Sequence, residues 1–334
     1  METDLHITPY IRKLLAQHPP RLAFSAADRA GWETWREELR GKLVGLLAPW
    51  PQTAGLRAVL LSTTDAGSHV REALRLSSDG LPDIPALLLR PKGAAARRPA
   101  ILALHGHGPG KAEVAGLDAG DAQVPYGLRM VEAGYVVLTF DFFPFGERRE
   151  SEHNAQEGYE YSCNSTLIRT LLLGVNLLTL NLFDVRRALD YLVTRPEVDA
   201  GRIGVMGCSY GGTASMYAAT LDERIKAAVL SCSLGEYRGH GVEIDELCGV
   251  QVVPGILQWA EMGDVAGLIA PKPLLTESAR ADTFFPWSWT EPTLRRLREV
   301  YRTAGAQERL DVRVYDGGHR YYGEGVLEFW EKYL

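Results

Sequence analysis

A serine between glycines carries the clearest chemical signal in the sequence. The segment Gly207-Cys208-Ser209-Tyr210-Gly211 matches G-x-S-x-G, follows the apolar run 203–206 and precedes a stretch of helix length. In a strand-turn-helix setting this motif presents the serine hydroxyl on a sharp turn, and the glycines leave room for that turn. We therefore expect Ser209 to be a nucleophile; the alternative is a serine that caps a helix.

A nucleophilic serine needs a base to take its proton and an acid to orient that base. Histidine is suited to this work because its pKa of about 6.5 lies near neutrality. Among eight histidines, His319 follows the last expected strand in a glycine-rich loop, and Asp282 follows the strand before it. The chain order serine, acid, histidine is the one found with this serine motif. We expect Asp282 to orient His319; the alternatives are a surface aspartate and a surface histidine.

The negative oxygen formed by serine attack needs backbone N–H donors, which are worth a few kcal/mol each. Tyr210 directly follows the nucleophile, and the glycine-rich loop 105–110 follows an apolar run. We expect the N–H groups of Tyr210 and His107 to be these donors. His105 and His107 could also bind a metal, but no carboxylate or cysteine is near them in the sequence, so we expect none. The loop lacks the glycines of a phosphate-binding motif, so no nucleotide cofactor is expected.

Aromatic residues surround the expected acid. Trp287 and Phe284 follow Asp282 closely. They could line a substrate pocket or pack in the core, and the sequence leaves both open.

Apolar runs alternate with helix-length segments through most of the chain. Uninterrupted apolar runs indicate strands buried on both faces of a parallel sheet, here 99–104, 135–140, 202–206 and 225–231. Later strands are expected at 273–277 and 310–315, and earlier, antiparallel ones at 69–77 and 85–90. Helices are expected at 123–133, 176–194, 213–221, 292–304 and 325–333. This alternation predicts an α/β fold with a mostly parallel central sheet flanked by helices.

The first part of the chain has a different pattern. Apolar side chains recur at spacings of three and four on one helical face: Trp32, Trp35, Leu39, Leu43, Leu46 and Leu47. We expect residues 1–60 to form a helical extension and 61–334 a catalytic domain. The stretches 147–165 and 234–263 are too long for simple connections and are expected to be insertions that form the pocket.

Composition excludes several partner classes. The net charge of -6 and the pI near 5.8 argue against nucleic acid and anionic membranes as partners. Residues 1–4 lack the features of a secretion signal, so we expect a cytoplasmic protein. The apolar stretch 167–183 contains Arg169, Asn176 and Asn181 and is expected to be a buried helix. The four cysteines lack metal-ligand spacing and are expected to be reduced, mostly buried thiols.

Taken together, these residues resemble the bacterial acetyl xylan esterases and dienelactone hydrolases of the α/β-hydrolase family. The resemblance runs from about residue 99 to the end of the chain. It is carried by the segments 105–108, 141–148, 184–191, 207–212, 261–264 and 317–319. It implies the α/β-hydrolase fold, a triad of Ser209, Asp282 and His319, and oxyanion donors at His107 and Tyr210.

The expected function is hydrolysis of a small or acetylated ester, such as an acylated carbohydrate, through an acyl-enzyme. A serine peptidase of the prolyl oligopeptidase type shares the triad order, but nothing before residue 99 is long enough for its usual additional domain. A non-catalytic binding protein of this fold would normally have lost a triad residue. The apolar helical extension could also mediate homo-oligomer formation.

Overall fold

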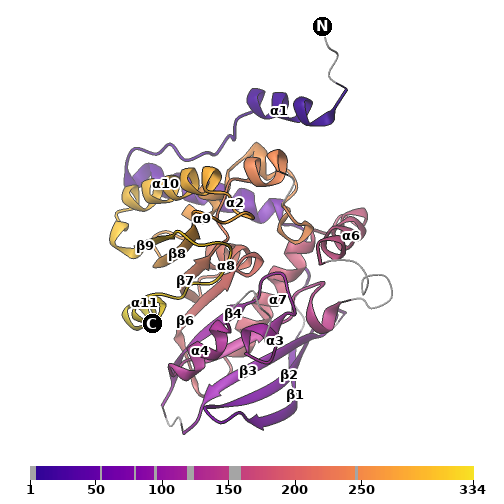
Figure 1. The fold of residues 1–334 in the computed structure, drawn as a ribbon, viewed down its shortest axis with the longest axis vertical. Coiled ribbons are helices and arrows are strands. Elements are labelled where there is room, and N and C mark those ends of the chain that lie inside the picture. The colour runs from indigo at the N-terminus through magenta and orange to yellow at the C-terminus, as the bar shows by residue number, and fades with distance from the viewer. Residues whose placement is uncertain are drawn as a thin grey trace.

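The computed structural model describes residues 5–52, 55–78, 80–93, 96–118, 124–149, 159–244 and 247–334. These residues build a nine-stranded sheet in the order β1-β2-β3-β5-β4-β6-β7-β8-β9 (Figure 1). The strands are β1 (Leu56–Asp65), β2 (His69–Ser78), β3 (Ile84–Pro91), β4 (Arg98–Leu104), β5 (Val136–Phe140), β6 (Val198–Cys208), β7 (Ile225–Ser231), β8 (Leu274–Ala279) and β9 (Leu310–Tyr315). Every strand expected from the sequence is present.

Strand direction divides the sheet into two parts. β1, β2, β3 and β5 pair antiparallel in succession. From β5 through β4 and on to β9 all neighbours pair parallel. The α/β architecture with a mostly parallel sheet is therefore confirmed. Because parallel strands end at the same edge of a sheet, the loops after β4, β6, β7, β8 and β9 gather there.

Helices cover both faces of the sheet. The helices of the described residues are α1 (Ile7–Gln17), α2 (Arg29–Leu46), α3 (Lys111–Val114), α4 (Tyr126–Glu132), α6 (Tyr159–Leu172), α7 (Leu177–Leu192), α8 (Tyr210–Leu221), α9 (Met262–Gly267), α10 (Trp287–Thr303) and α11 (Val326–Tyr333), of which α1 does not pack on the sheet. Alternate residues of β4 enter different cores: Ala100 and Leu102 pack with α2, α7, α8 and α10, whereas Ile101 and Ala103 pack with α3, α4 and α11. Both faces of the strand are thus buried, which explains its uninterrupted apolar sequence.

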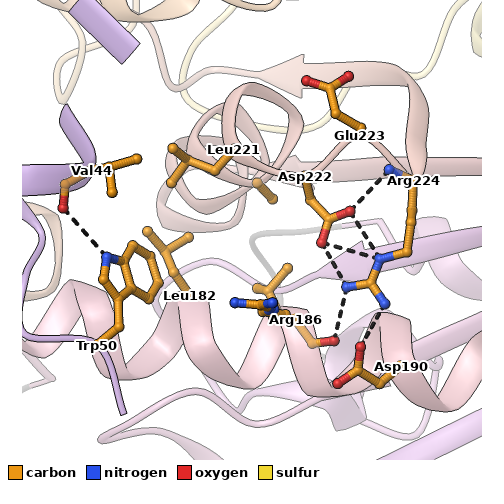
Figure 2. A pocket seen from close by; sticks show the side chains of 11 residues that line it. Val44, Trp50, Leu182, Arg186, Asp190, Leu221, Asp222, Glu223 and Arg224 are labelled. Carbon is orange, nitrogen blue, oxygen red and sulfur yellow. Dashed lines mark hydrogen bonds and ion pairs between the residues drawn. The ribbon is translucent and has the colours of Figure 1, made fainter. Parts of the chain in front are cut away.

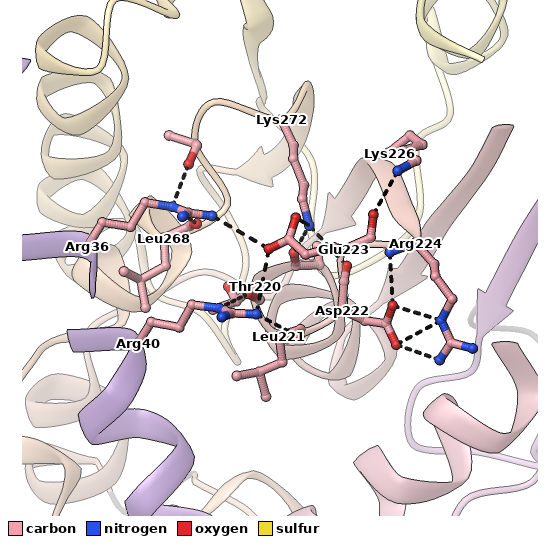
Figure 3. Close-up of polar contacts among 12 residues, drawn as sticks. Arg36, Arg40, Thr220, Leu221, Asp222, Glu223, Arg224, Lys226, Leu268 and Lys272 are labelled. Carbon is pink, nitrogen blue, oxygen red and sulfur yellow. Dashed lines mark hydrogen bonds and ion pairs between the residues drawn. The ribbon is translucent and has the colours of Figure 1, made fainter. Parts of the chain in front are cut away.

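The helix α2 is bound to the sheet domain by its apolar face and by two arginines. Asp28 caps its first turn by accepting a hydrogen bond from Gly31 N, and Trp32, Trp35, Leu39 and Leu43 are buried as expected. Arg40 donates to the carbonyl oxygens of Thr220 and Leu221 at the end of α8, and Arg36 to those of Leu268 and Ala270. Figure 3 shows both arginines beside Glu223. The cations satisfy carbonyl groups that a helix end leaves without partners.

The helix α1 has no buried residue and lies at the periphery of the molecule, in contact with the segment Gly239–Glu243 (Figure 1). Its Arg12 pairs with Glu243. The strand β1 begins at Leu56, inside the range assigned to the helical extension, and most of it is exposed. β1 itself was not predicted, because the first strand expected from the sequence is 69–77, which corresponds to β2.

The prediction of a single buried helix over 167–183 is wrong. The chain forms two helices, α6 and α7, with a break around Gly174, and Leu172 and Leu173 are exposed. Glycine at φ 72° permits the turn, and Asn176 begins α7 by accepting a hydrogen bond from Leu178 N. No single helix in the described ranges is long and apolar enough to cross a membrane; α6 and α7 meet that test only as a pair bent by 96°. Part of the expected insertion 147–165 lies outside the described residues, at 150–158.

Candidate active site

Ser209 lies on a tight turn between β6 and α8. Its backbone adopts φ 57° and ψ -127°, a conformation that non-glycine residues rarely adopt, and its side chain is largely buried. The turn is closed by Ser209 N, which donates to Ser231 O on β7 at 2.9 Å. A Cβ atom at Gly211 would lie 2.0 Å from Leu104 O, and one at Gly207 would lie 2.3 Å from the Gly211 carbonyl carbon. The glycines of the motif are therefore required by close backbone contact.

Asp282 and His319 form a hydrogen-bonded pair at the same edge of the sheet. Nδ1 of His319 lies 2.8 Å from Oδ2 of Asp282. The other carboxylate oxygen, Oδ1, accepts from the N–H groups of Phe284 at 2.9 Å and Phe285 at 3.0 Å. Asp282 is buried and His319 is partly exposed. The aspartate is held rigidly, and its remaining oxygen fixes the orientation of the imidazole.

The structure places Ser209 at the end of β6, two strands away from β8, which precedes Asp282. Among the described residues no hydrogen bond joins the Ser209 hydroxyl to His319. Such bonds are often long in the absence of substrate and shorten when it binds. The contact between Ser209 and His319 therefore stays a prediction, whereas the expected proximity of Asp282 and His319 is observed.

The loop that carries His319 is held by a carboxylate that the sequence analysis left without a role. Glu277 on β8 is buried and accepts hydrogen bonds from Gly323 N at 2.6 Å, Tyr322 N at 3.4 Å and Ser231 Oγ at 2.5 Å. Burial raises the pKa of this carboxyl above its ordinary value. Its place at the end of a buried strand is the only sequence signal that could have identified it.

Cys232, which follows β7, lies beside the Asp282–His319 pair. One ligand atom from each of the three residues lies within 4.8 Å of the others. Cys232 has φ 43°, and its Sγ donates to Arg320 O at 3.2 Å in the histidine loop. Burial raises the pKa of its thiol, so the proton stays on sulfur. The sequence shows no sign of this contact, because it arises from strand order alone.

His240, which lacks a motif of its own in the sequence, reaches the same region through a stack of rings. The His240 ring stacks on Phe285 at 4.5 Å between centroids, and Phe285 stacks on His319 at 5.8 Å. Burial lowers the pKa of His240 to about 4. A neutral imidazole therefore packs behind the base at neutral pH.

The two histidines of the loop 105–110 have different surroundings. His105 is fully buried: its Nε2 accepts from Phe142 N at 3.0 Å, and its Nδ1 lies 2.7 Å from Gly106 O. Burial lowers its pKa to about 4, so it stays neutral and anchors the loop. The His107 ring instead packs against Phe145 at 5.3 Å and Tyr210 at 5.9 Å. The loop thereby brings His107 to the first residue of α8, next to Ser209.

Of the two aromatic residues that could line a substrate pocket, one lies beside the hydrogen-bonded pair of Asp282 and His319. Phe284 is 47% exposed, and its ring centroid lies 4.9 Å from that of His319. Trp287 is half-buried, packs against the larger core and has the guanidinium of Arg280 over its ring at 4.5 Å. Phe284 is thus placed to contact a substrate, and Trp287 has a structural role in packing.

A hollow of about 470 Å³ lies elsewhere, between α2, α7 and the end of α8 (Figure 2). Trp50 and Leu182 line its apolar part, and Asp190, Asp222 and Arg224 form ion pairs on its polar side. It contains none of the residues expected to carry the chemistry. We assign it no part in the site.

Two groups of side chains among the described residues have the composition of a metal site. One is Cys232, Asp282 and His319; the other is His107, Cys163 and Cys248. In the second group the pKa of Cys248 is lowered to about 5, chiefly by the hydrogen bond from Cys163, with His107 adding to the effect. As expected, all four cysteines of the chain are buried and form no disulfide.

Comparison with known proteins identifies relatives of the whole chain. The sequence model of the Abhydrolase family matches residues 5–315. A Bacillus subtilis (strain 168) protein named "Putative hydrolase YtaP" is 28% identical over 293 residues, which cover 85% of this chain and 94% of that protein.

Solved structures of carbohydrate esterases share the fold. A Bacteroides fragilis protein titled "putative acetyl xylan esterase" superimposes with a TM-score of 0.80 at 21% identity, covering 94% of this chain and 82% of the other. A glucuronoyl esterase from Solibacter usitatus superimposes with a TM-score of 0.65 at 17% identity, covering 94% and 97%. At these identities the likeness is one of fold alone.

Proposed function

Because the chain belongs to the Abhydrolase family, whose fold is that of the α/β hydrolases, we propose that it hydrolyses carboxylic esters by serine catalysis. Ser209 is the nucleophile, His319 the base and Asp282 the acid that orients the base. The observation that carries this proposal is the 2.8 Å hydrogen bond between Asp282 and His319 at the sheet edge where the turn presents Ser209. That combination is what nucleophilic catalysis by serine requires.

The mechanism follows from these positions. When substrate binds, Nε2 of His319 takes the proton of Ser209 Oγ as that oxygen attacks the ester carbonyl. Asp282 accepts from Nδ1–H and stabilises the imidazolium that forms. The proton then passes to the leaving alcohol as the C–O bond breaks, which leaves an acyl group on the serine. His319 then takes a proton from water as the water oxygen attacks the acyl carbon. The bond between that carbon and Ser209 Oγ breaks, Oγ regains the proton from His319, and the carboxylic acid product leaves.

The negative oxygen of each tetrahedral intermediate needs two donors. We assign this role to the backbone N–H groups of His107 and Tyr210, neither of which donates a hydrogen bond within the described part of the chain. The burial of His105 and its bond to Phe142 N fix the loop that carries the first donor. Preorganised donors lower the barrier because they need no rearrangement during the reaction.

The proposed substrate class is a small or acetylated ester, including acetylated carbohydrates. Acetyl xylan and glucuronoyl esterases share this fold, and Phe284 offers an exposed ring beside His319 against which an acyl or sugar group could pack. A panel of acetylated sugars, lactones and short aryl esters compares these substrates directly.

The decisive experiment combines labelling and turnover. A fluorophosphonate should add one label per chain, and p-nitrophenyl acetate should be hydrolysed; Ser209→Ala should abolish both. Ser278→Ala is a matched control, since Ser278 is also buried at a strand end but belongs to no proposed catalytic group. Labelling that persists in Ser209→Ala would contradict the assignment. If the chain is labelled and hydrolyses peptide p-nitroanilides but not esters, it is a peptidase. If it is neither labelled nor hydrolyses any of these substrates, it is a binding protein.

A further inference from the structure

Three segments far apart in the sequence meet beside the proposed oxyanion loop. His107 belongs to that loop, Cys163 to α6, and Cys248 directly precedes the short helix η3 (Gly249–Gln251). A ring nitrogen of His107 and the two sulfur atoms all lie within 4.8 Å of one another. Both cysteines are buried. In the sequence no cysteine is near the histidines of the loop; the fold brings two of them there.

Backbone contacts hold this group together. Gly249 N donates to Asn164 Oδ1 at 2.9 Å, and a Cβ atom at Gly249 would lie 2.6 Å from Cys163 O. The backbones that carry Cys163 and Cys248 are therefore in direct contact. On the other side, Phe145 and Tyr210 pack against the His107 ring. The three side chains are thus preorganised by packing from three elements.

One atom of the group lacks a partner. The buried Nε2 of His107 makes no hydrogen bond to any described residue. A buried ring nitrogen without a partner is unfavourable and calls for an explanation, such as an ion or a ligand.

We propose that His107, Cys163 and Cys248 form a binding site for a thiophilic metal ion of the Zn²⁺ class. Zn²⁺ takes sulfur ligands at about 2.3 Å and imidazole nitrogen at about 2.0 Å in tetrahedral geometry, so its ligand atoms lie about 3.5–4 Å apart. The three ligand atoms lie within 4.8 Å of one another, so small side-chain movements would bring them to the separations of a tetrahedral Zn²⁺ site. Two thiolates and one imidazole select Zn²⁺ or Cu⁺ over Mg²⁺ and Ca²⁺, which prefer oxygen.

The ion would join α6 and η3 to the loop 105–110. Since the N–H of His107 is a proposed oxyanion donor, occupancy of the site would fix that donor through its own side chain. The site supplies no general acid or base, and its existence does not depend on ester hydrolysis. The other group of metal-ligating residues, Cys232 with Asp282 and His319, belongs to the proposed catalytic site, and its thiol already donates to Arg320 O.

Co²⁺ is the probe, because thiolate coordination gives it a charge-transfer band in the near ultraviolet and tetrahedral geometry gives strong visible bands. The full chain, reduced with a phosphine and freed of metal by a chelator, is titrated with Co²⁺ and then with Zn²⁺. We expect one Co²⁺ per chain, displaced by Zn²⁺. Cys163→Ser and Cys248→Ser should remove the thiolate band and weaken affinity by more than the roughly 10–100-fold that an outer-shell partner is worth.

Cys232→Ser is the matched control and should keep both the band and the stoichiometry. The proposal is overturned if no thiolate band appears, if the band survives in both Cys163→Ser and Cys248→Ser, or if only Cys232→Ser removes it.

Alkylation of the wild-type chain provides a test that needs no variant, since a buried cysteine replaced by serine can prevent folding. Zn²⁺ should slow modification of Cys163 and Cys248, because a thiolate bound to the metal is no longer a free nucleophile. The rate at Cys232 should not change, which makes this residue the internal reference. Equal rates with and without Zn²⁺ at all three positions would overturn the site.

Discussion

Gly323, four residues after His319, donates a 2.6 Å hydrogen bond from its backbone N–H to Oε1 of Glu277. The same carboxylate accepts from Tyr322 N and from Ser231 Oγ, so it joins the histidine loop to β7 and β8. Because β8 also leads into the loop of Asp282, one buried side chain determines how the loops of the acid and the base lie relative to each other.

Replacement of Glu277 should therefore lower activity through the position of His319. Glu277→Leu leaves two N–H groups and one hydroxyl without an acceptor, and each such group costs about 1–3 kcal/mol. We expect a lower free energy of unfolding in urea and a fall in kcat with a smaller change in KM. Glu277→Gln keeps an acceptor oxygen and should retain more of the wild-type stability and more of the wild-type kcat than Glu277→Leu. Wild-type kcat in a folded Glu277→Leu protein would contradict this role.

Asp282→Asn should nearly abolish activity without unfolding the protein. The amide oxygen can still accept from Phe284 N and Phe285 N, but the amide group no longer favours the Nδ1–H tautomer of His319. We expect kcat for p-nitrophenyl acetate to fall by about 10⁴-fold, as in a well-studied serine protease.

Asp316→Asn is the matched control for that substitution, since Asp316 also lies in a loop near His319 but its side chain is 96% exposed. It should keep wild-type kcat. A small effect of Asp282→Asn together with a large effect of Asp316→Asn would reverse the assignment of the acid.

The elements could be predicted where burial leaves a pattern in the sequence. β9 has the bounds expected from the sequence, where Leu310, Val312 and Val314 pack against the core and alternate with charged residues. β4 is buried on both faces, so its residues must all be apolar. β1 was missed because it is an edge strand with little buried surface and therefore no alternation. The break at Gly174 was missed because apolar residues continue on both sides of it, including exposed leucines.

The candidate site was predictable only where local sequence determines local geometry. The turn at Ser209 needs glycines within two residues on either side, so its motif is visible in the sequence. His240 reaches His319 through the ring of Phe285, and Cys163 meets Cys248 through packing of α6 against η3. Such contacts join segments tens of residues apart, and no spacing in a single sequence encodes them.

Gly211→Ala should destabilise the fold and reduce activity together. The new Cβ would lie 2.0 Å from Leu104 O, so β4 or the start of α8 must shift. Overpacking of this kind costs about 1–3 kcal/mol or more. Gly41→Ala in α2 is the control: nothing lies within 4 Å of its Cβ, and alanine should stabilise the helix by about 0.5–1 kcal/mol. Unfolding in urea measures both, and equal changes in the two variants would contradict the close contact.

The neutral, buried His240 should make the protein less stable in acid. Its pKa is lowered by burial to about 4, whereas in the unfolded chain it returns to about 6.5. Between these values the unfolded chain binds a proton that the folded chain excludes, so stability falls as pH decreases from 6.5 to 4. The loss attributable to His240 reaches about 3 kcal/mol at most.

Buried acids act in the opposite direction, since burial raises the pKa of Glu113 and Glu261 to about 7. The measurement is therefore a difference: the free energy of unfolding of wild type and His240→Gln at pH 7 and pH 4.5. The variant has no imidazole to protonate, so it should lose less stability than wild type over that interval. His18→Gln, at an exposed position, should match wild type. Identical losses in wild type and His240→Gln would mean that His240 is protonated in the folded state, and that the ring stacked on Phe285 is an imidazolium.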